Sequence, residues 1–129
     1  MVQHHHIEGY ENFVSFIEVF KPEGDLVIYF SGTKEENTGE SWCDDCQRAW
    51  PVISKVLKTA NPMLNFVYVE VGDRPTWKDP NCPFRKNPST KLMVLPTLIK
   101  WNTPKRLNGD QCEKEELVKM LFFEDDDDD

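Results

Sequence analysis

Two cysteines three positions apart, Cys43 and Cys46, are the residues of this chain whose type and spacing point most directly to chemistry. They follow a stretch with the apolar character of a buried strand, and they open a stretch with helical periodicity. A helix N-terminus leaves backbone N–H groups unpaired and carries about half a positive charge, which lowers the pKa of a thiol placed there. Because a thiolate attacks disulfides and a second thiol one turn later can close on the first, the pair predicts dithiol–disulfide exchange.

The two residues between the cysteines, Asp44 and Asp45, oppose this effect and are predicted to tune the redox chemistry. An exposed carboxylate about 7 Å from a sulfur costs the thiolate only ~0.6 kcal/mol in a water-like dielectric. The helix dipole contributes a similar amount, about 0.3–1 kcal/mol at an exposed site. We therefore predict that the pKa of Cys43 lies below the ~8.5 of a free cysteine. Asp45 stands between the sulfurs in sequence and is placed to perturb both.

Metal binding is the main alternative for a C-x-x-C pair, because the same spacing is half of a structural zinc site. The other half would be a second cysteine pair or a histidine pair. Cys82 and Cys112 are isolated in sequence and are interpreted as ordinary thiols, and the consecutive histidines 4–6 favour a terminal strand. No metal site is expected. Two other functions stay open here: a zinc-stabilised binding domain, and an interaction module that binds partners according to its disulfide state without turnover.

Two further residues are candidates for contact with a substrate. Trp42 precedes the first cysteine and is interpreted equally well as a core aromatic or as a shield that offers a flat apolar surface to a peptide. Pro96 separates two apolar runs, which predicts an edge strand or a special backbone geometry. Because cis X–Pro bonds are infrequent, the sequence by itself gives no ground for predicting one at this position.

The remaining sequence supplies the elements that must position these residues. Apolar periodicity predicts an α/β fold with helices at 10–20 and 43–60 and a last helix capped by Asp110 with Glu113, and with strands at 25–31, 66–71, 97–101 and 105–108. A short strand near 3–7 completes the pattern, and 72–90 is predicted to hold only short helical turns. A helix joining two buried strands favours a parallel pair, whereas the last two strands favour a hairpin. The sequence thus predicts a single domain with a mixed sheet and helices on both faces.

The 129-residue chain has the length of one domain, which we place at 1–123, followed by an acidic tail at 124–129. Its net charge of −8 argues against nucleic acid and anionic membrane partners, which attract clusters of Lys and Arg. No apolar run approaches the roughly 20 residues that span a bilayer, and the N-terminus lacks the basic and hydrophobic regions of a secretory signal. We therefore expect a cytoplasmic protein, and we also expect it to be a monomer.

The combination of motifs resembles the thioredoxin family. Trp42 with the two cysteines opens a helix, Pro51 lies five residues past Cys46, a later Pro96-Thr97 pair follows, and Gly109 precedes the last helix. This resemblance implies a thioredoxin fold, with Cys43 as the nucleophile and Cys46 as the resolving thiol. It also implies that Pro96 is cis and that the backbone of Leu95 faces the substrate.

The resemblance implies an activity as well. A thioredoxin-like chain reduces disulfides in proteins or cystine, needs no bound cofactor and is recharged by an NADPH-dependent thioredoxin reductase; here a narrower substrate range than that of thioredoxin is implied. One departure concerns the resolving thiol. The buried aspartate that thioredoxins place before the first cysteine has no counterpart in 26–30, so the group that accepts the Cys46 proton stays open.

Overall fold

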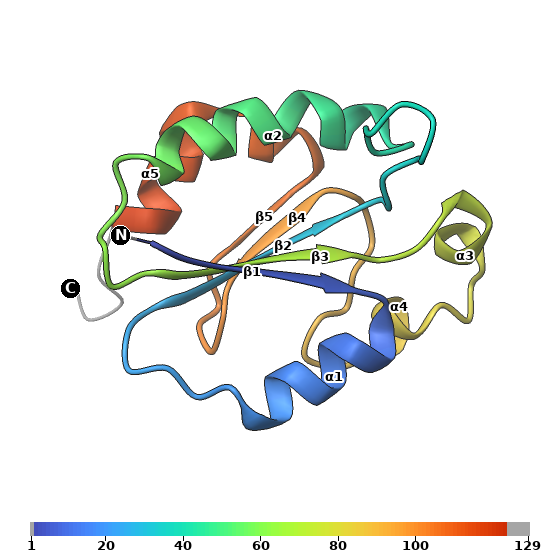
Figure 1. Ribbon diagram of the computed structural model, residues 1–129, viewed down its shortest axis with the longest axis horizontal. Coiled ribbons are helices and arrows are strands. Elements are labelled where there is room, and N and C mark those ends of the chain that lie inside the picture. The colour runs from blue at the N-terminus through green and yellow to red at the C-terminus, as the bar shows by residue number, and fades with distance from the viewer. Residues whose placement is uncertain (1, 124–129) are drawn as a thin grey trace.

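A five-stranded mixed sheet runs through the middle of the protein, with helices packed on both of its faces (Figure 1). The structure, a computed structural model, describes residues 2–123, and the acidic tail predicted at 124–129 lies outside the described residues. The elements follow the order β1 (Gln3–Glu8), α1 (Tyr10–Val19), β2 (Leu26–Ser31), α2 (Asp44–Leu57), β3 (Asn65–Glu70), α3 (Arg74–Lys78), α4 (Pro83–Lys86), β4 (Thr97–Lys100), β5 (Arg106–Asn108), a 3₁₀ helix (Gly109–Glu113) and α5 (Glu115–Phe123).

The strands lie in the order β1-β3-β2-β4-β5, which confirms the predicted mixed sheet. Strand β2 pairs in parallel with β3, and β4 forms antiparallel ladders with β2 and β5. The parallel pair follows from the helical crossover through α2, because two parallel strands cannot be joined by a tight turn. The short strand predicted near the N-terminus is present as β1, which pairs in parallel with β3 at the edge of the sheet.

Strand β2 is buried at every position, and its side chains belong to two separate hydrophobic cores, one on each face of the sheet. Ile28 and Phe30 pack with residues of α1 and α4, whereas Val27 and Tyr29 pack with residues of α2 and α5. Successive side chains of a strand point to opposite faces, so an uninterrupted apolar run is the pattern expected of a strand covered on both sides. The helices predicted for the two faces are thus confirmed.

The start of the last helix differs from the prediction. Asp110 and Glu113 lie in the 3₁₀ helix, and α5 begins only at Glu115. The capping box is formed one step earlier, where the Asn108 side chain accepts from the backbone of Gln111 and the Gln111 side chain accepts from the Asn108 N–H at 2.9 Å. Asn108 has the extended backbone that a cap requires, so it outcompetes Asp110 for this position.

The topology brings three chain segments together at one end of the three central strands, β3, β2 and β4. Parallel β2 and β3 end there, and antiparallel β4 begins there. The cysteine pair follows β2, α3 follows β3, and Pro96 directly precedes β4. Within residues 2–123, none of the helices combines the length and apolar character needed to cross a membrane.

Candidate active site

Cys43 is the N-cap residue of α2, so its sulfur lies where the unpaired amides of the first helical turn converge. Its backbone is extended (φ −90°, ψ 111°), as N-cap residues require, and its sulfur accepts a hydrogen bond from the Cys46 N–H at 3.3 Å. The loop before the helix fixes this geometry, because the Cys43 N–H donates to Ser41 Oγ at 3.1 Å. A thiol therefore occupies the position that a serine or aspartate commonly takes at a helix start.

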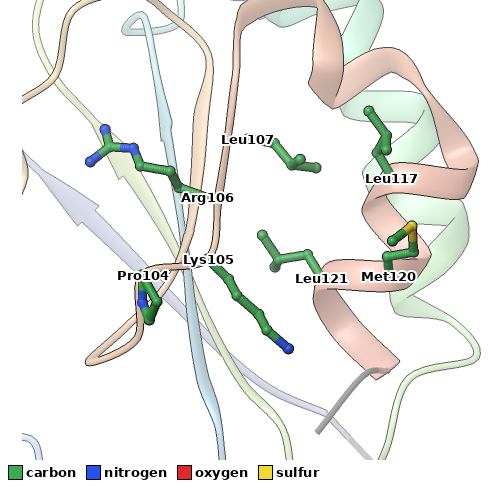
Figure 2. Close-up of a pocket in the computed structure, with 7 residues that line it drawn as sticks. All are labelled: Pro104, Lys105, Arg106, Leu107, Leu117, Met120 and Leu121. Atoms are coloured by element: carbon green, nitrogen blue, oxygen red, sulfur yellow. The ribbon is translucent and has the colours of Figure 1, made fainter. Parts of the chain in front are cut away.

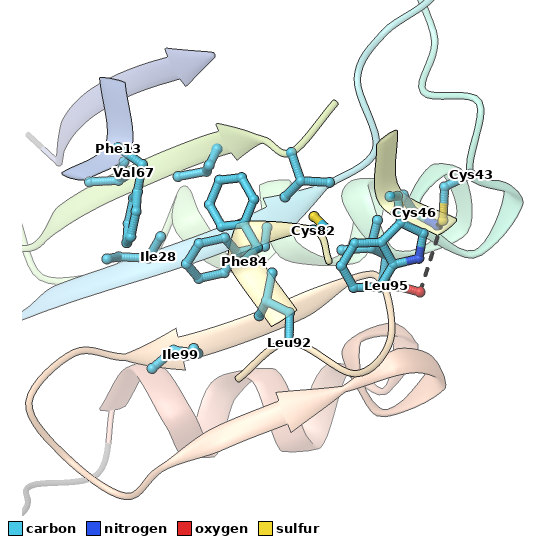
Figure 3. Close-up of a cluster of buried hydrophobic side chains, with 14 of the residues drawn as sticks. Phe13, Ile28, Cys43, Cys46, Val67, Cys82, Phe84, Leu92, Leu95 and Ile99 are labelled. Atoms are coloured by element: carbon cyan, nitrogen blue, oxygen red, sulfur yellow. Dashed lines mark hydrogen bonds between the residues drawn. The ribbon is translucent and has the colours of Figure 1, made fainter. Parts of the chain in front are cut away.

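The Cys43 sulfur faces the loop that precedes β4. The Leu95–Pro96 peptide bond is cis, as the resemblance to thioredoxins implied, and Cys43 Sγ lies 3.9 Å from the Leu95 carbonyl oxygen. Figure 3 shows Cys43, Cys46 and Leu95 together at one end of the larger buried cluster. Cys43 is only 9% exposed, yet it lines an open cleft of about 460 Å³ that Trp42 and Leu95 also line. A disulfide can therefore approach the sulfur from this cleft.

Hydrogen bonding lowers the pKa of Cys43 to about 7. The largest cause is a hydrogen bond from the Cys46 thiol, and the Cys46 N–H adds to it; partial burial acts in the opposite direction. The charge of Asp44 raises the pKa and that of Arg48 lowers it, both as smaller effects. The direction agrees with the prediction from the helix start, but the largest cause is the second thiol, and the Cys46 N–H of the first helical turn lowers the pKa by less.

This arrangement predicts a pH profile for alkylation of Cys43 by iodoacetamide. Below the pKa the sulfur is protonated and inert, and above it the thiolate reacts, so the rate should rise with a midpoint near pH 7. Cys46→Ala removes the thiol donor and should move the midpoint upward. Mass spectrometry of the labelled peptide restricts the measurement to Cys43. A midpoint at or above about 8.5, the value of a free cysteine, would contradict the prediction.

Cys46 has the opposite character, because it is 1% exposed and its pKa is raised. The hydrogen bond it gives to Cys43 is the largest cause, followed by burial, whereas hydrogen bonds with the Gly32 backbone and the Ser31 side chain lower the pKa. Ser31 is itself fully buried and accepts a hydrogen bond from the Tyr68 hydroxyl at 3.4 Å. Tyr68 and Cys46 also line a hollow of about 320 Å³. Sequence analysis missed Ser31 and Tyr68, which are distant from the cysteines in sequence.

Loss of the Ser31 hydroxyl should slow resolution, the step in which Cys46 attacks the mixed disulfide at Cys43. The hydroxyl can donate to the Cys46 thiolate as it forms, and a hydrogen bond to a charged group contributes about 1.5–3 kcal/mol, so Ser31→Ala should slow resolution about tenfold or more. The measurement is stopped-flow release of thionitrobenzoate from the mixed disulfide that Cys43 forms with Ellman's reagent. Ser31→Thr retains a hydroxyl and serves as the matched control. Equal rates for the wild-type and alanine proteins would exclude this role.

The two acidic residues of the motif occupy different environments. Asp44 and Asp45 are both exposed on the first turn of α2. Asp45 forms an ion pair with Arg48, which also lies 3.4 Å from a carboxylate oxygen of Glu113. Asp44 is the acid whose charge acts on Cys43. The tuning role of Asp45 stays a prediction, and its pairing with Arg48 is the contact that would transmit it.

Trp42 has features of both interpretations given above, the core aromatic and the surface offered to a peptide. Its ring is half-buried against Gly32, and its Nε1 donates to the Gly72 carbonyl at 2.9 Å. A Cβ atom at Gly32 would lie 2.7 Å from the Trp42 ring, so only glycine permits this close approach. The remaining part of Trp42 lines the cleft beside Cys43. Trp42 is therefore anchored like a core residue and still presents a surface to the cleft.

The other thiols and the potential metal ligands lie apart from the cysteine pair. Cys82 and Cys112 are both buried, and burial raises the pKa of Cys112 to about 12, which makes its thiol inert. Among residues 2–123, the side chains of His6, Glu8 and Glu70 bring potential ligand atoms within 4.8 Å of one another. Neither Cys43 nor Cys46 belongs to that group.

A further hollow of about 280 Å³ lies between β5 and α5 (Figure 2). Figure 2 shows leucine side chains from both elements facing this space, with Met120 at its side. The residues that line it are Pro104, Lys105, Arg106, Leu107, Leu117, Met120 and Leu121. No thiol lines it, so it belongs to a different part of the protein from the cleft at Cys43.

Comparison with known proteins agrees with this geometry. Residues 6–124 match the family described as thioredoxin domain-containing protein 17-like, thioredoxin domain. The chain is 42% identical to thioredoxin domain-containing protein 17 of Danio rerio and 41% identical to that of Homo sapiens, in each case over 92% of this chain and 94% of the relative. It is also 41% identical to the thioredoxin-like protein Clot of Arabidopsis thaliana, over 74% of this chain and 73% of that protein.

Solved structures show the same fold. Reduced thioredoxin pre-protein of Schistosoma mansoni superposes with a TM-score of 0.56 at 19% identity, covering 92% of this chain and 99% of that one. This likeness confirms the thioredoxin fold predicted from the sequence. The thioredoxin-like matches support a general thiol–disulfide oxidoreductase role. The chain belongs to the thioredoxin domain-containing protein 17-like family.

Proposed function

We propose that this protein is a protein-disulfide reductase that acts in the cytoplasm on disulfide-containing proteins or cystine. Cys43 is the attacking thiolate and Cys46 the resolving thiol. The oxidised pair is returned to the dithiol by an NADPH-dependent thioredoxin reductase. The reducing equivalents come from this partner, so the protein itself needs no bound cofactor.

One observation carries the proposal. The sulfur with the lowered pKa lies at the start of α2, 3.9 Å from the Leu95 carbonyl oxygen, in an open cleft, and the second thiol lies one turn behind it. The lowered pKa supplies the nucleophile near neutral pH. The backbone beside cis-Pro96 offers polar groups to a substrate chain that lies across the sulfur. A cysteine placed only for packing needs none of these features.

The proposed reaction proceeds in two exchanges. The Cys43 thiolate attacks one sulfur of the substrate disulfide, a mixed disulfide forms, and the other substrate sulfur leaves as a thiolate. Cys46 then loses its proton and attacks Cys43 Sγ, which forms the Cys43–Cys46 disulfide and releases the second substrate thiolate. The two thiolates take up protons from solvent. The substrate gains two electrons, and the protein loses two.

The wall of the cleft supports the narrower substrate range. Residues from α3 and α4 line it opposite the helix that carries the cysteines. These short helices lie in the segment between β3 and β4, and their side chains line the same cleft as Cys43. A large substrate must fit its surface to this wall before its disulfide reaches the sulfur, which excludes substrates of unsuitable shape or charge.

The test is a coupled assay in which thioredoxin reductase and NADPH recharge the protein while it reduces cystine or a panel of disulfide-containing proteins. We expect NADPH oxidation that depends on this protein, with a shorter list of protein substrates than thioredoxin reduces under the same conditions. Binding of a partner that depends on the redox state, without any NADPH oxidation, would overturn the proposal in favour of an interaction module.

A further inference from the structure

The cleft at Cys43 has walls of opposite charge. Asp44 and Asp45 lie on the α2 side together with one cation, Arg48, whereas the other side carries three cations, Arg74, Lys78 and Arg85, from α3 and α4. This positive wall stands in a chain whose net charge is −8. A cationic surface beside the reactive sulfur of an acidic protein attracts negatively charged partners to that one place.

Arg85 is held in a fixed position at this wall. Its guanidinium lies 3.8 Å from the centroid of the Trp77 ring, and its Nε donates to the Trp77 carbonyl at 2.8 Å. Trp77 itself is 5% exposed and belongs to the larger buried cluster, so its ring is held in place by the core. The stack and the Nε bond leave the two terminal nitrogens of the guanidinium for another partner. Within residues 2–123, no carboxylate pairs with Arg85.

A guanidinium held in this way is suited to a carboxylate. Its planar fork of donors matches the two oxygens of a carboxylate, and a side chain that is already ordered loses less entropy when it binds. Arg48, by contrast, already pairs with Asp45 and Glu113 on the α2 side. The cations of the α3 and α4 wall are therefore the ones available to an incoming anion.

Arg74 and Lys78 extend the positive charge around Arg85. Both side chains are exposed on α3, and neither forms an ion pair with another residue in the described part of the chain. Exposed charges of this kind contribute mainly to the rate of encounter and to the choice of partner. Together with Arg85 they form what we call the basic wall, defined by Arg74, Lys78 and Arg85.

Apolar side chains at the edge of the same cleft favour an acidic polypeptide over a small anion as the ligand. Met93 is 79% exposed and Val94 is 42% exposed, and both lie just before the Leu95–Pro96 bond. A small anion would leave these side chains in water. A polypeptide that lies across Cys43 covers them and gains the free energy of apolar burial. The combination favours a polypeptide with acidic residues close to its disulfide.

We propose that the basic wall recognises an acidic side chain next to the disulfide of a polypeptide substrate, with Arg85 binding the carboxylate. This inference rests on the proposed function and names its substrate class. Asp44 repels the same acidic residue from the opposite wall, where Asp45 is already paired with Arg48, so the charges also set the direction in which the substrate lies. The exchange at Cys43 and Cys46 proceeds as described above.

The test uses two synthetic peptides with the same intramolecular disulfide, one flanked by Asp and Glu and the other by Lys. The rate of reduction of each by the reduced protein is measured in single turnover. We expect the acidic peptide to react about tenfold faster at low ionic strength, and we expect the difference to shrink in added salt because exposed charges are screened. Arg85→Lys keeps the positive charge but loses the paired guanidinium donors that match a carboxylate, so it should reduce the preference for the acidic peptide. The double variant Arg74→Gln with Lys78→Gln should reduce this preference as well.

Lys58→Gln is the control for a lost charge, because Lys58 is exposed at the far end of α2 and its replacement removes one positive charge, where the double variant removes two, without touching the cleft. It should leave the preference intact. Thermal unfolding of each variant separates a loss of binding from a loss of fold, and the exposed pair Arg74 and Lys78 provides a second route if Arg85→Lys unfolds. Equal rates for the two peptides with wild-type protein would overturn this inference and leave the proposed function standing. Failure to reduce either peptide would overturn both.

Discussion

Cys43→Ser should abolish the reduction of disulfides, lowering the rate in the coupled assay by about a thousandfold or more. The replacement puts a hydroxyl where the thiolate was, and a serine hydroxyl is a weak nucleophile without an adjacent general base. No histidine lines the cleft at this position. Helix α2 retains a good cap, because serine is favoured at the N-cap position. The loss should therefore come from the chemistry and not from the fold.

Cys82→Ala provides the control for this measurement. Cys82 is 2% exposed and packs in the same buried cluster as the redox pair, but it does not line the cleft. Its replacement removes one thiol and should keep the rate per folded molecule, at a cost in stability of about 1 kcal/mol. The coupled assay is run on both variants after thermal unfolding curves confirm that they fold. Wild-type rates from Cys43→Ser would remove the basis of the proposed mechanism.

Local signals made the cysteine pair and the main elements predictable. The apolar run at 26–30, rich in β-forming residues, favoured a buried strand, and the C-x-x-C spacing placed both thiols at the start of the next helix. These predictions depend on residues that are neighbours in the chain, so periodicity and capping preferences are sufficient to make them. The cis bond before Pro96 came from the resemblance alone, because no local pattern distinguishes it from a trans bond.

The surroundings of the thiols could not be predicted in the same way. Ser31 and Tyr68 are 37 positions apart and meet only because β2 and β3 are adjacent in the sheet. Arg85 and Trp77 lie in the segment predicted to hold only short helical turns, where no periodicity indicates that one side chain will stack on the other. Such contacts depend on the tertiary packing of short helices. The misplaced cap of α5 has a related cause, since two polar residues competed and only the backbone geometry of Asn108 decided between them.

Cys43 and Cys46 have pKa values shifted in opposite directions by the same hydrogen bond. The Cys46 thiol gives its hydrogen bond to the Cys43 sulfur, which favours the thiolate at Cys43 and holds the proton on Cys46. In the proposed mechanism this asymmetry gives the first attack to Cys43, which lines the open cleft, and leaves the buried Cys46 for the second step. Once Cys43 enters a mixed disulfide it no longer carries a charge. In the proposed mechanism Cys46 then ionises more readily, and the hydrogen bond with Ser31, which lowers the pKa of Cys46, assists this step.

Cys46→Ser should convert the protein into a trap for its substrates. The first exchange still occurs, because Cys43 keeps its position at the helix start and a serine hydroxyl can replace the Cys46 thiol as hydrogen-bond donor. The second exchange fails, since a hydroxyl does not displace a thiolate from a disulfide. We expect a mixed disulfide that accumulates to about one substrate per chain. Denaturing gels without reductant should show this adduct, and added dithiothreitol should remove it.

The double variant Cys43→Ser with Cys46→Ser is the matched control and should capture nothing. Capture that persists in it would assign the adduct to Cys82 or Cys112, which are both buried in the folded protein. Absence of any adduct with Cys46→Ser, in a protein whose Cys43 still reacts with iodoacetamide, would contradict attack by Cys43 on disulfides. Because the trap records only the first exchange, a mixture of the acidic and basic peptides offered to it reports the choice made at the cleft. The acidic peptide should fill the trap first, since the charges that favour it act before the sulfurs exchange.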